Sequence, residues 1–383
     1  MSVTAARGFT AAGIAAGIKQ NGDRDLALVV NNGPDRGAAG VFTSNRVQAA
    51  PVQWSRRVLA DGEIRAVVLN SGGANACTGP QGREDTYATA EKAAEALGLD
   101  PADVAVCSTG LIGVPLPMDR ILAGVESAAA RLSESGGEDA AIAVMTTDSV
   151  HKTAAVTRGG WTVGGMAKGA GMLAPGLATM LVVLTTDAAL DGAALDRALR
   201  DATRVTFDRV DSDGCMSTND TVLLLSSGAS GVTPDHAEFA EAVRDVCDDL
   251  ARRLIGDAEG ASKEIRIEVV GAAGEDDAVE VGRSVARSNL LKCAIHGEDP
   301  NWGRVLSAIG TTSAAFEPDR LNVAINDVWV CRNGSVGEDR ALVDMTGREV
   351  AITVDLAAGT DRAVIWANDL TAAYVHENSE YAS

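Results

Sequence analysis

The sequence predicts an α/β fold, and three observations support this class. Short β-rich runs alternate with longer segments of helical periodicity along the 383 residues. Residues 180–184, Met-Leu-Val-Val-Leu, are continuously apolar, as expected of a strand that is buried on both faces. Aromatic residues make up only 3% of the chain, so small side chains must fill a core of closely packed layers.

The β-rich runs are spread over the whole chain. Ile265, Ile267 and Val269 alternate with charged residues, which predicts a half-exposed strand. The other runs are more uniformly apolar and predict buried strands. The predicted strands cover residues 26–30, 64–69, 104–107, 180–185, 222–225, 265–270, 350–354 and 363–367.

The segments between these strands predict helices. Thr233 followed by Pro234 is typical of a helix N-cap and first helical position. A second helix is expected to begin at Asp191, and alanine-rich helices are expected over residues 85–98 and 117–132. The apolar face of the helix after Pro234 consists of Phe239, Val243, Val246, Leu250 and Leu254.

A domain boundary is expected in the last third of the chain. Residues 271–277 are rich in Gly, Ala and Asp and directly follow a predicted strand. We therefore expect a main α/β domain over residues 1–275 and a smaller α/β domain over residues 276–383. No internal repeat or low-complexity linker is apparent.

The net charge of the chain argues against two classes of binding partner. Lys and Arg total 33 and Asp and Glu total 53, which gives a formal net charge of −20. A surface this acidic repels phosphate backbones and anionic lipids, so neither nucleic acid nor a membrane is an expected partner. The apolar runs are too short to span a bilayer, and the first residues lack the apolar region of a signal peptide. A cytoplasmic location is expected.

Cysteine and histidine spacing argues against metal chemistry. The six cysteines form no C-x-x-C pair, and none of the four histidines has metal-ligand spacing with another. We therefore expect free and mostly buried thiols, no metal site and no required cofactor. The chain also has neither a G-x-S-x-G elbow nor a Walker loop.

A candidate nucleophile lies at the entrance of the most apolar predicted strand. A glycine-rich loop beginning at Lys168 leads through a Pro-Gly turn to Ala178 and Thr179. The hydroxyl of Thr179 could attack the preceding carbonyl, and the α-amine freed by cleavage could then act as the base for that hydroxyl. Thr also begins many ordinary strands, and the spacing alone favours this simpler interpretation.

Three further segments place small polar residues beside strands. Residues 107–113 contain Thr109 and Gly110, which could offer a hydroxyl and a backbone N–H to an oxyanion, or could form an ordinary turn. Residues 70–79 could line a polar site or form a simple polar turn, with neither favoured. Residues 299–304, which include a Trp and an Arg, are better explained as a structural loop corner.

The order of these segments resembles one family. Residues 168–181 resemble the self-cleavage site of the ornithine acetyltransferases, also called glutamate N-acetyltransferases, of arginine biosynthesis. The resemblance covers nearly the whole chain, and several motifs in family order are far more specific than any one of them. The other similar blocks are residues 40–45, 70–77, 108–113, 145–148, 216–220, 257–263 and 299–304.

The resemblance implies roles for individual residues. Thr179 matches the nucleophile, and the Ala178–Thr179 bond matches the cleavage site, which would give chains of residues 1–178 and 179–383. Thr109 and Gly110 match the oxyanion hole. The family usually ends in a Thr where this chain has Ala382, which affects how its tail closes the site. The substrate-contacting positions are matched by Thr147 (chosen over Thr146), Lys168, Thr179, Glu259, Asn378 and Ser383.

The resemblance also implies an activity and an assembly. N-acetylornithine would acylate Thr179, and glutamate would then take the acetyl group in a ping-pong reaction, with acetyl-CoA as an alternative donor. Lys168 would pair with a substrate carboxylate, and Glu259 would meet either the ornithine side chain or a substrate amine. The implied fold is a layered α/β sandwich of N-terminal-nucleophile character, and the implied assembly has two α and two β chains.

Two alternatives stay open at this point. An N-terminal-nucleophile aminopeptidase or amidase of similar fold would pass the acyl group to water instead of glutamate. An uncleaved relative would serve as a binding or scaffold protein and would remain a single chain of 39.2 kDa.

Overall fold

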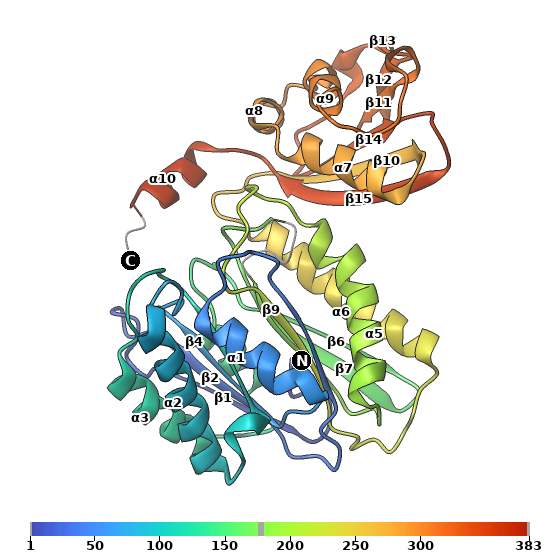
Figure 1. Cartoon of the computed structure of the whole chain (residues 1–383). Helices are drawn as coiled ribbons and strands as arrows, with labels where there is room; N and C mark the ends of the chain where they lie inside the picture. The colour runs from blue at the N-terminus through green and yellow to red at the C-terminus, as the bar shows by residue number, and fades with distance from the viewer. Residues whose placement is uncertain (1, 175–179, 381–383) are drawn as a thin grey trace. The chain divides into compact units, whose positions relative to one another are not determined.

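The structure, a computed structural model, describes residues 2–174 and 180–380. Their backbone contacts form two compact units (Figure 1). Within the described residues, the first unit comprises residues up to Asp208 together with Cys215–Leu254, and the second comprises Arg209–Gly214 and the residues from Ile255 onward.

The first unit contains two sheets. The four-stranded sheet has the order β1-β2-β4-β5, and the five-stranded sheet has the order β3-β9-β8-β7-β6. The pairs β4–β5 and β8–β9 are parallel, and the other neighbours are antiparallel. The strands are β1 (Phe9–Ile14), β2 (Leu26–Asn31), β3 (Ala38–Phe42), β4 (Ala66–Ser71), β5 (Val104–Thr109), β6 (Lys152–Arg158), β7 (Trp161–Lys168), β8 (Leu181–Thr186) and β9 (Thr221–Ser226).

Helices cover the outer faces of these sheets. One apolar cluster lies between the sheets and joins side chains such as Val67 of β4 and Val183 of β8. A second cluster packs α2 and α3 on the other face of the four-stranded sheet. Val246 and Leu250 of α6 approach Gly165 on the other face of the five-stranded sheet. The helices are α1 (Ala50–Val58), α2 (Gly79–Leu97), α3 (Met118–Ala129), α4 (Gly137–Ala143), α5 (Gly192–Val205) and α6 (His236–Gly256).

This order of layers, helix–sheet–sheet–helix, is the layered α/β sandwich that the family resemblance implies. The close approach at Gly165 shows why small residues are needed. A Cβ at that position would lie 2.6 Å from a Leu184 methyl carbon. The low aromatic content therefore matches a core in which side chains of the layers interdigitate at short range.

The helix starts follow from local capping. Asp191 caps α5, because its carboxylate accepts a hydrogen bond from the Ala194 N–H at 2.8 Å. The start predicted for α6 at Thr233 and Pro234 is wrong by about one half-turn. The helix begins at His236, because the carboxylate of Asp235 caps it by accepting from the Ala237 N–H at 2.9 Å.

The second unit is built around a six-stranded sheet of order β13-β12-β11-β14-β10-β15. Helix α7 packs against β10 and β15, and a separate apolar core fills the space between sheet and helices. Its strands are β10 (Glu264–Ala272), β11 (Asn322–Ile325), β12 (Val328–Arg332), β13 (Ser335–Val336), β14 (Glu349–Asp355) and β15 (Asp361–Asn368). Its helices are α7 (Glu275–Ala286), α8 (Asn289–His296), α9 (Trp302–Ile309) and α10 (Ala372–Glu380).

The division between the units differs from the expected boundary at residue 275. Strand β10 belongs to the second unit, so the chain passes from one unit to the other between Leu254 and Ile255. Residues 273 and 274 form the short turn between β10 and α7. A Gly- and Ala-rich turn inside a domain therefore has the same composition as a linker.

All eight predicted strands are strands of the structure, within two residues at most ends. The missed strands are short or rich in small residues, which weakens the period-two signal. Strand β7 is the important case, because Lys168 was assigned to a glycine-rich loop and is in fact the last residue of that strand.

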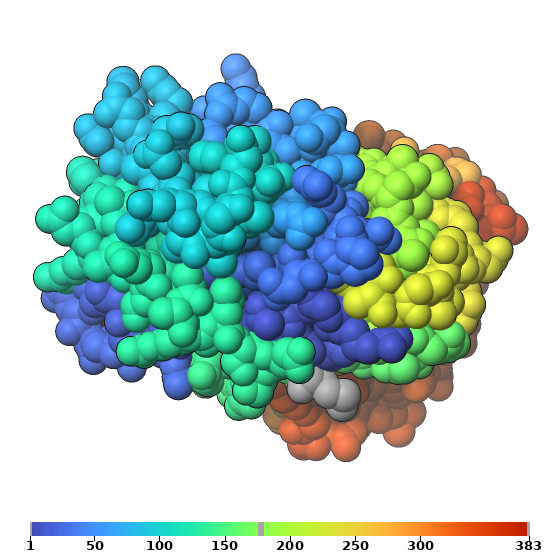
Figure 2. Space-filling view, turned by 90° about the horizontal axis from the view of Figure 1, so that it is seen from below, coloured from blue at the N-terminus to red at the C-terminus, as the bar shows by residue number. Residues whose placement is uncertain are grey.

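The N-terminal segment before β1 contacts the residues that follow β8 and β9. In Figure 2 the dark-blue N-terminal residues lie on the surface between green and yellow segments. Arg7 forms an ion pair with Asp187 at 3.0 Å, and its backbone oxygen accepts from the Ser227 hydroxyl at 2.6 Å. The segment before β1 is therefore fixed to both β8 and β9 by contacts at their C-terminal ends.

The six cysteines are free thiols. Cys107, Cys247 and Cys331 are buried, as expected, whereas Cys77, Cys215 and Cys293 are exposed. Among the described helices, none is long and apolar enough to cross a membrane.

Candidate active site

Thr109 and Gly110 lie where β5 ends. The Thr109 side chain is buried, and its backbone oxygen accepts from the Gly73 N–H at 3.0 Å. Gly110 has a φ of +127°, and a Cβ there would lie 2.5 Å from the Gly73 nitrogen. This position therefore requires glycine, both for its backbone conformation and for the close approach of the neighbouring loop.

The loop that follows β4 supports this pair. The side chain of Asn70, near the end of β4 itself, accepts from the Ser108 hydroxyl at 2.6 Å. Asn219, which lies just before β9, donates to the backbone oxygens of Ala74 at 2.6 Å and Ser108 at 2.8 Å. The polar residues of segment 70–79 thus join the ends of β4 and β5, which are parallel neighbours.

Lys168 brings a buried ammonium to the same region. It is only 2% exposed and pairs with Leu181, the first residue of β8, across the β7–β8 ladder. Its Nζ donates to the Thr109 hydroxyl oxygen at 3.4 Å. Because that oxygen accepts from Lys168, the hydroxyl proton of Thr109 is available to point elsewhere.

Asp148 balances the buried positive charge. Its carboxylate accepts from Lys152 Nζ at 2.6 Å and from the Gly169 N–H at 2.7 Å. Burial alone would raise the pKa of Asp148, but the ammonium groups of Lys168 and Lys152 outweigh it and hold that pKa below its ordinary value. Asp148 therefore stays ionised between the two lysines.

Thr147 directly precedes Asp148 in the loop between α4 and β6 and is half-buried. The Asp148 carboxylate also accepts from the Thr146 N–H at 3.0 Å, which fixes the backbone on the other side of Thr147. The loop position of Thr147 is therefore set by the same carboxylate that faces Lys168.

Asp220 is a second buried acid beside the start of β8. Its carboxyl accepts from the Met180 N–H at 3.2 Å, and the side chains of Ser217 and Thr43 also hydrogen-bond to it. Burial raises the pKa of Asp220 well above its ordinary range, more than these contacts and the charge of Lys168 lower it. A neutral carboxyl at the peptide that follows residue 179 is the expected state.

Glu259 and Asn378 meet in the second unit. The Asn378 amide donates to the Glu259 carboxylate at 2.9 Å. Asn378 is exposed and Glu259 is half-buried, and they come from α10 and from the segment after α6. The structure thus brings two of the predicted substrate-contacting residues together although they are 119 positions apart.

The predicted residues form two groups within the described residues. Thr109, Gly110, Thr147 and Lys168 cluster in the first unit, and Glu259 and Asn378 pair in the second. Their joining into one site is part of the proposal below. Ala178, Thr179 and Ser383 lie outside the described residues.

Sequence reasoning assigned no role to Asp148, Lys152, Asn219 or Asp220. Asp148, Asn219 and Asp220 lie in blocks that resemble the family, but an isolated acid or amide carries no spacing signal of its own. Residues 299–304 lead into α9, and Asn301 caps that helix. Among residues 2–174 and 180–380, no cluster of three or more His, Cys, Asp or Glu side chains is arranged to hold a metal ion.

Comparison with known proteins gives concordant matches. The family model described as "ArgJ family" matches residues 10–383. The chain is 77% identical over 383 residues to the arginine biosynthesis bifunctional protein ArgJ of Streptomyces coelicolor and 78% identical to that of Streptomyces avermitilis, covering 100% of each chain. A solved ornithine acetyltransferase from Mycobacterium tuberculosis, complexed with ornithine, matches with 57% identity and a TM-score of 0.45, covering 47% of this chain and 96% of that chain.

Replacing Gly110 by Ala should destabilise the protein. The new Cβ would contact the Gly73 backbone at 2.5 Å, and forced overpacking of this kind costs about 1–3 kcal/mol beyond backbone strain. Gly113→Ala is the matched control, because Gly113 has a φ of +81° but no atom within 4 Å of the added Cβ. Denaturant unfolding of both variants checks this, and equal losses of stability would contradict the steric argument.

The Asp220→Asn variant should change how stability depends on pH. With its pKa raised, Asp220 binds a proton more tightly in the folded than in the unfolded chain, so its contribution to stability is lost as pH rises through the raised pKa. From about pH 4 up to that pKa, wild type should lose about 1.4 kcal/mol per pH unit relative to the variant. Denaturant unfolding across pH measures this difference, and parallel pH curves for the two proteins would refute it.

Proposed function

The chain belongs to the ArgJ family, and we propose that it transfers the acetyl group of N-acetylornithine to glutamate through an acyl-enzyme on Thr179. Membership in this family makes it an acyltransferase of arginine biosynthesis. The proposal adds to that membership the nucleophile, the oxyanion hole and the substrate contacts.

One observation carries the proposal. The Thr109 hydroxyl lies 3.4 Å from the ammonium of Lys168, and Lys168 pairs with Leu181, two residues after Thr179. An oxyanion donor and a buried cation therefore lie next to each other beside the start of the strand that follows the proposed nucleophile. Because Lys168 occupies a lone pair of the Thr109 oxygen, the Thr109 O–H is left to donate to substrate.

Acylation begins when the Thr179 hydroxyl attacks the acetyl carbonyl of N-acetylornithine. The α-amine of Thr179, freed by self-cleavage, accepts the hydroxyl proton. The Thr109 hydroxyl and the Gly110 N–H donate to the oxyanion of the tetrahedral intermediate. Collapse of that intermediate breaks the C–N bond, the departing ornithine amine takes up the proton, and an acetyl ester remains on Thr179.

In the second half-reaction the acetyl group passes from Thr179 to glutamate. The glutamate amine attacks the ester carbonyl, the same two donors hold the oxyanion, and Thr179 leaves as a hydroxyl. Lys168 pairs with a substrate carboxylate, and Thr147, Glu259, Asn378 and Ser383 complete the substrate contacts. Glu259 is a half-buried acid that accepts a hydrogen bond from the Asn378 amide, which suits it to a cationic substrate group.

Self-cleavage uses the same nucleophile on its own backbone. The Thr179 hydroxyl attacks the Ala178 carbonyl, the acyl group moves from nitrogen to oxygen, and water releases the upstream chain. Asp220 supports this step, because its carboxyl accepts from the N–H of Met180 and so fixes the peptide on the other side of Thr179.

Four further features belong to the proposal. The products of cleavage assemble as two α and two β chains, the reaction needs no cofactor, and the enzyme works in the cytoplasm. Acetyl-CoA serves as an alternative acetyl donor for glutamate, and an assay that supplies only acetyl-CoA and glutamate tests this directly.

Self-cleavage should depend on Thr179. Purified wild type should give two chains on denaturing mass analysis, and the second chain should begin at Thr179. Thr179→Ala should remain a single chain of about 39.2 kDa, because no hydroxyl is left to attack the Ala178 carbonyl. A cleaved Thr179→Ala protein, or an uncleaved wild type after long incubation, would rule out this mechanism.

Glutamate should outcompete water as acetyl acceptor. With N-acetylornithine as donor, release of ornithine should accelerate at least tenfold when glutamate is added, and N-acetylglutamate should appear in equal amount. Acyl transfer to water would instead release acetate at a rate that glutamate does not change. That result would favour an amidase of similar mechanism.

A further inference from the structure

A buried carboxylate in the second unit holds the segment that carries Glu259. Asp369, which follows β15, is only 1% exposed. It accepts hydrogen bonds from the backbone N–H groups of Ser262 and Lys263, both at 2.9 Å, and from the Ser262 hydroxyl. His296 Nδ1 adds a fourth contact at 3.0 Å. One carboxylate thus binds two consecutive peptides of segment 257–263.

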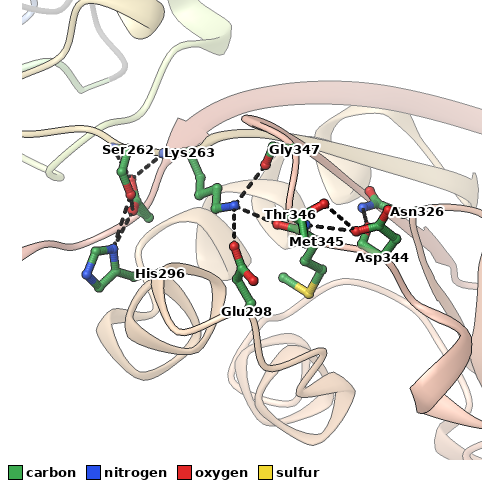
Figure 3. Close-up of polar contacts among 10 residues, drawn as sticks. Ser262, Lys263, His296, Glu298, Asn326, Asp344, Met345, Thr346 and Gly347 are labelled. Carbon is green, nitrogen blue, oxygen red and sulfur yellow. Dashed lines mark hydrogen bonds and ion pairs between the residues drawn. The ribbon is translucent and has the colours of Figure 1, made fainter.

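The Lys263 side chain anchors the same segment a second time. Its Nζ donates to the Glu298 carboxylate at 2.9 Å and to the backbone oxygens of Met345 at 2.6 Å and Gly347 at 2.9 Å (Figure 3). These three acceptors match the three donors of an ammonium group. Figure 3 also shows Ser262 and His296 beside this lysine, so backbone and side chain of the segment are held from both directions.

The chain after Asp369 returns to Glu259. The Thr371 hydroxyl donates to the Gly260 backbone oxygen at 2.7 Å and accepts from the Tyr374 N–H at 3.0 Å. Gly260 has a φ of +63°, and a Cβ there would lie 2.2 Å from the Tyr374 nitrogen. Further along α10, the hydrogen bond from Asn378 to Glu259 is the last of these contacts between the two segments.

The environment of Asp369 keeps it ionised. Burial alone would raise the pKa of Asp369, but the hydrogen bonds from Ser262, Lys263 and His296 outweigh it and lower that pKa. A buried anion with these donors is a rigid fixing point, because moving any donor away leaves part of its charge uncompensated.

We propose that Asp369 is a positioning residue for substrate binding. By fixing the backbone at Ser262 and Lys263, just before β10, it sets the position from which Glu259 and its hydrogen-bond partner Asn378 meet substrate. The inference rests on the proposed substrate role of these two residues. It assigns Asp369 no contact with substrate, so its whole effect must pass through Glu259, whose carboxylate is also the acceptor for Asn378.

A double-mutant cycle in the full-length, self-cleaved enzyme tests this. Glu259→Gln alone should raise the KM for at least one of the two substrates, and Asp369→Asn alone should raise the same KM about tenfold, with kcat reduced less and self-cleavage complete. If Asp369 acts through Glu259, the double variant should bind no worse than the weaker-binding single variant.

Asp355→Asn is the matched control. Asp355 ends β14 and likewise accepts from a backbone N–H, that of Ala357 at 2.9 Å. Its carboxylate also accepts from the Asn322 amide at 3.1 Å, and both donors lie outside residues 257–263. Its KM values should equal those of wild type. An equal KM increase in Asp355→Asn would show that Asp369→Asn reports general loosening of the unit, and would overturn the inference.

The remaining outcomes distinguish the role of Asp369 from the role of Glu259. Independent, multiplicative KM increases in the double variant overturn the role of Asp369 and leave that of Glu259 intact. Unchanged kinetics in Glu259→Gln overturn the proposed role of Glu259 and the inference with it. Should Asp369→Asn fail to fold, His296→Ala removes one donor from the same carboxylate at a half-exposed position. It should raise the same KM about two- to threefold, and only when Glu259 is present.

Discussion

Two buried ammonium groups, on Lys152 and Lys168, impose the constraint on which the strand ends of the first unit depend. A charge with almost no exposed surface is tolerated only beside a countercharge and hydrogen-bond acceptors. Asp148 supplies the countercharge for both lysines and also binds the Gly169 N–H just after β7. The loop before β6 must therefore lie against the end of β7, and Thr147 is carried there with it.

The same constraint explains why the site can be built from small residues. Lys168 reaches the Thr109 hydroxyl, and Gly110 lets the backbone after β5 approach the loop after β4. Asn219, just before β9, hydrogen-bonds to both that loop and the end of β5, and so holds the two together. Rigid placement of donors before substrate arrives is the property that oxyanion stabilisation requires.

The sequence was informative where one strong signal decides the structure. The apolar run of β8 and the Asp191 cap identified their elements correctly, because burial on both faces and a capping carboxylate leave few alternatives. The helix start at Thr233 was wrong because Asp235, two residues later, is an equally good cap and lies closer to the first free N–H groups. Strand β7 was missed, because its glycines weaken the pattern of a strand, although close packing against α6 explains one of them, Gly165.

The candidate site was predictable only in part, and mainly through resemblance. The spacing of Thr109 and Gly110 alone does not distinguish an oxyanion hole from an ordinary turn. Asp148 and Asp220 were missed because their importance comes from burial next to charges that lie far away in sequence. The same holds for Asp369, which lies 106 residues from the Lys263 N–H that it binds. No local pattern reports such a contact.

The uneven exposure of the cysteines makes the protein convenient for spectroscopy. Burial raises the pKa of the Cys107 thiol to about 12, so it and the other buried thiols will react slowly with maleimides or methanethiosulfonates. Cys77 in the first unit and Cys293 in the second are exposed. With Cys215 replaced by Ser, nitroxides on these two native positions would report the separation of the units in solution, without any engineered attachment point.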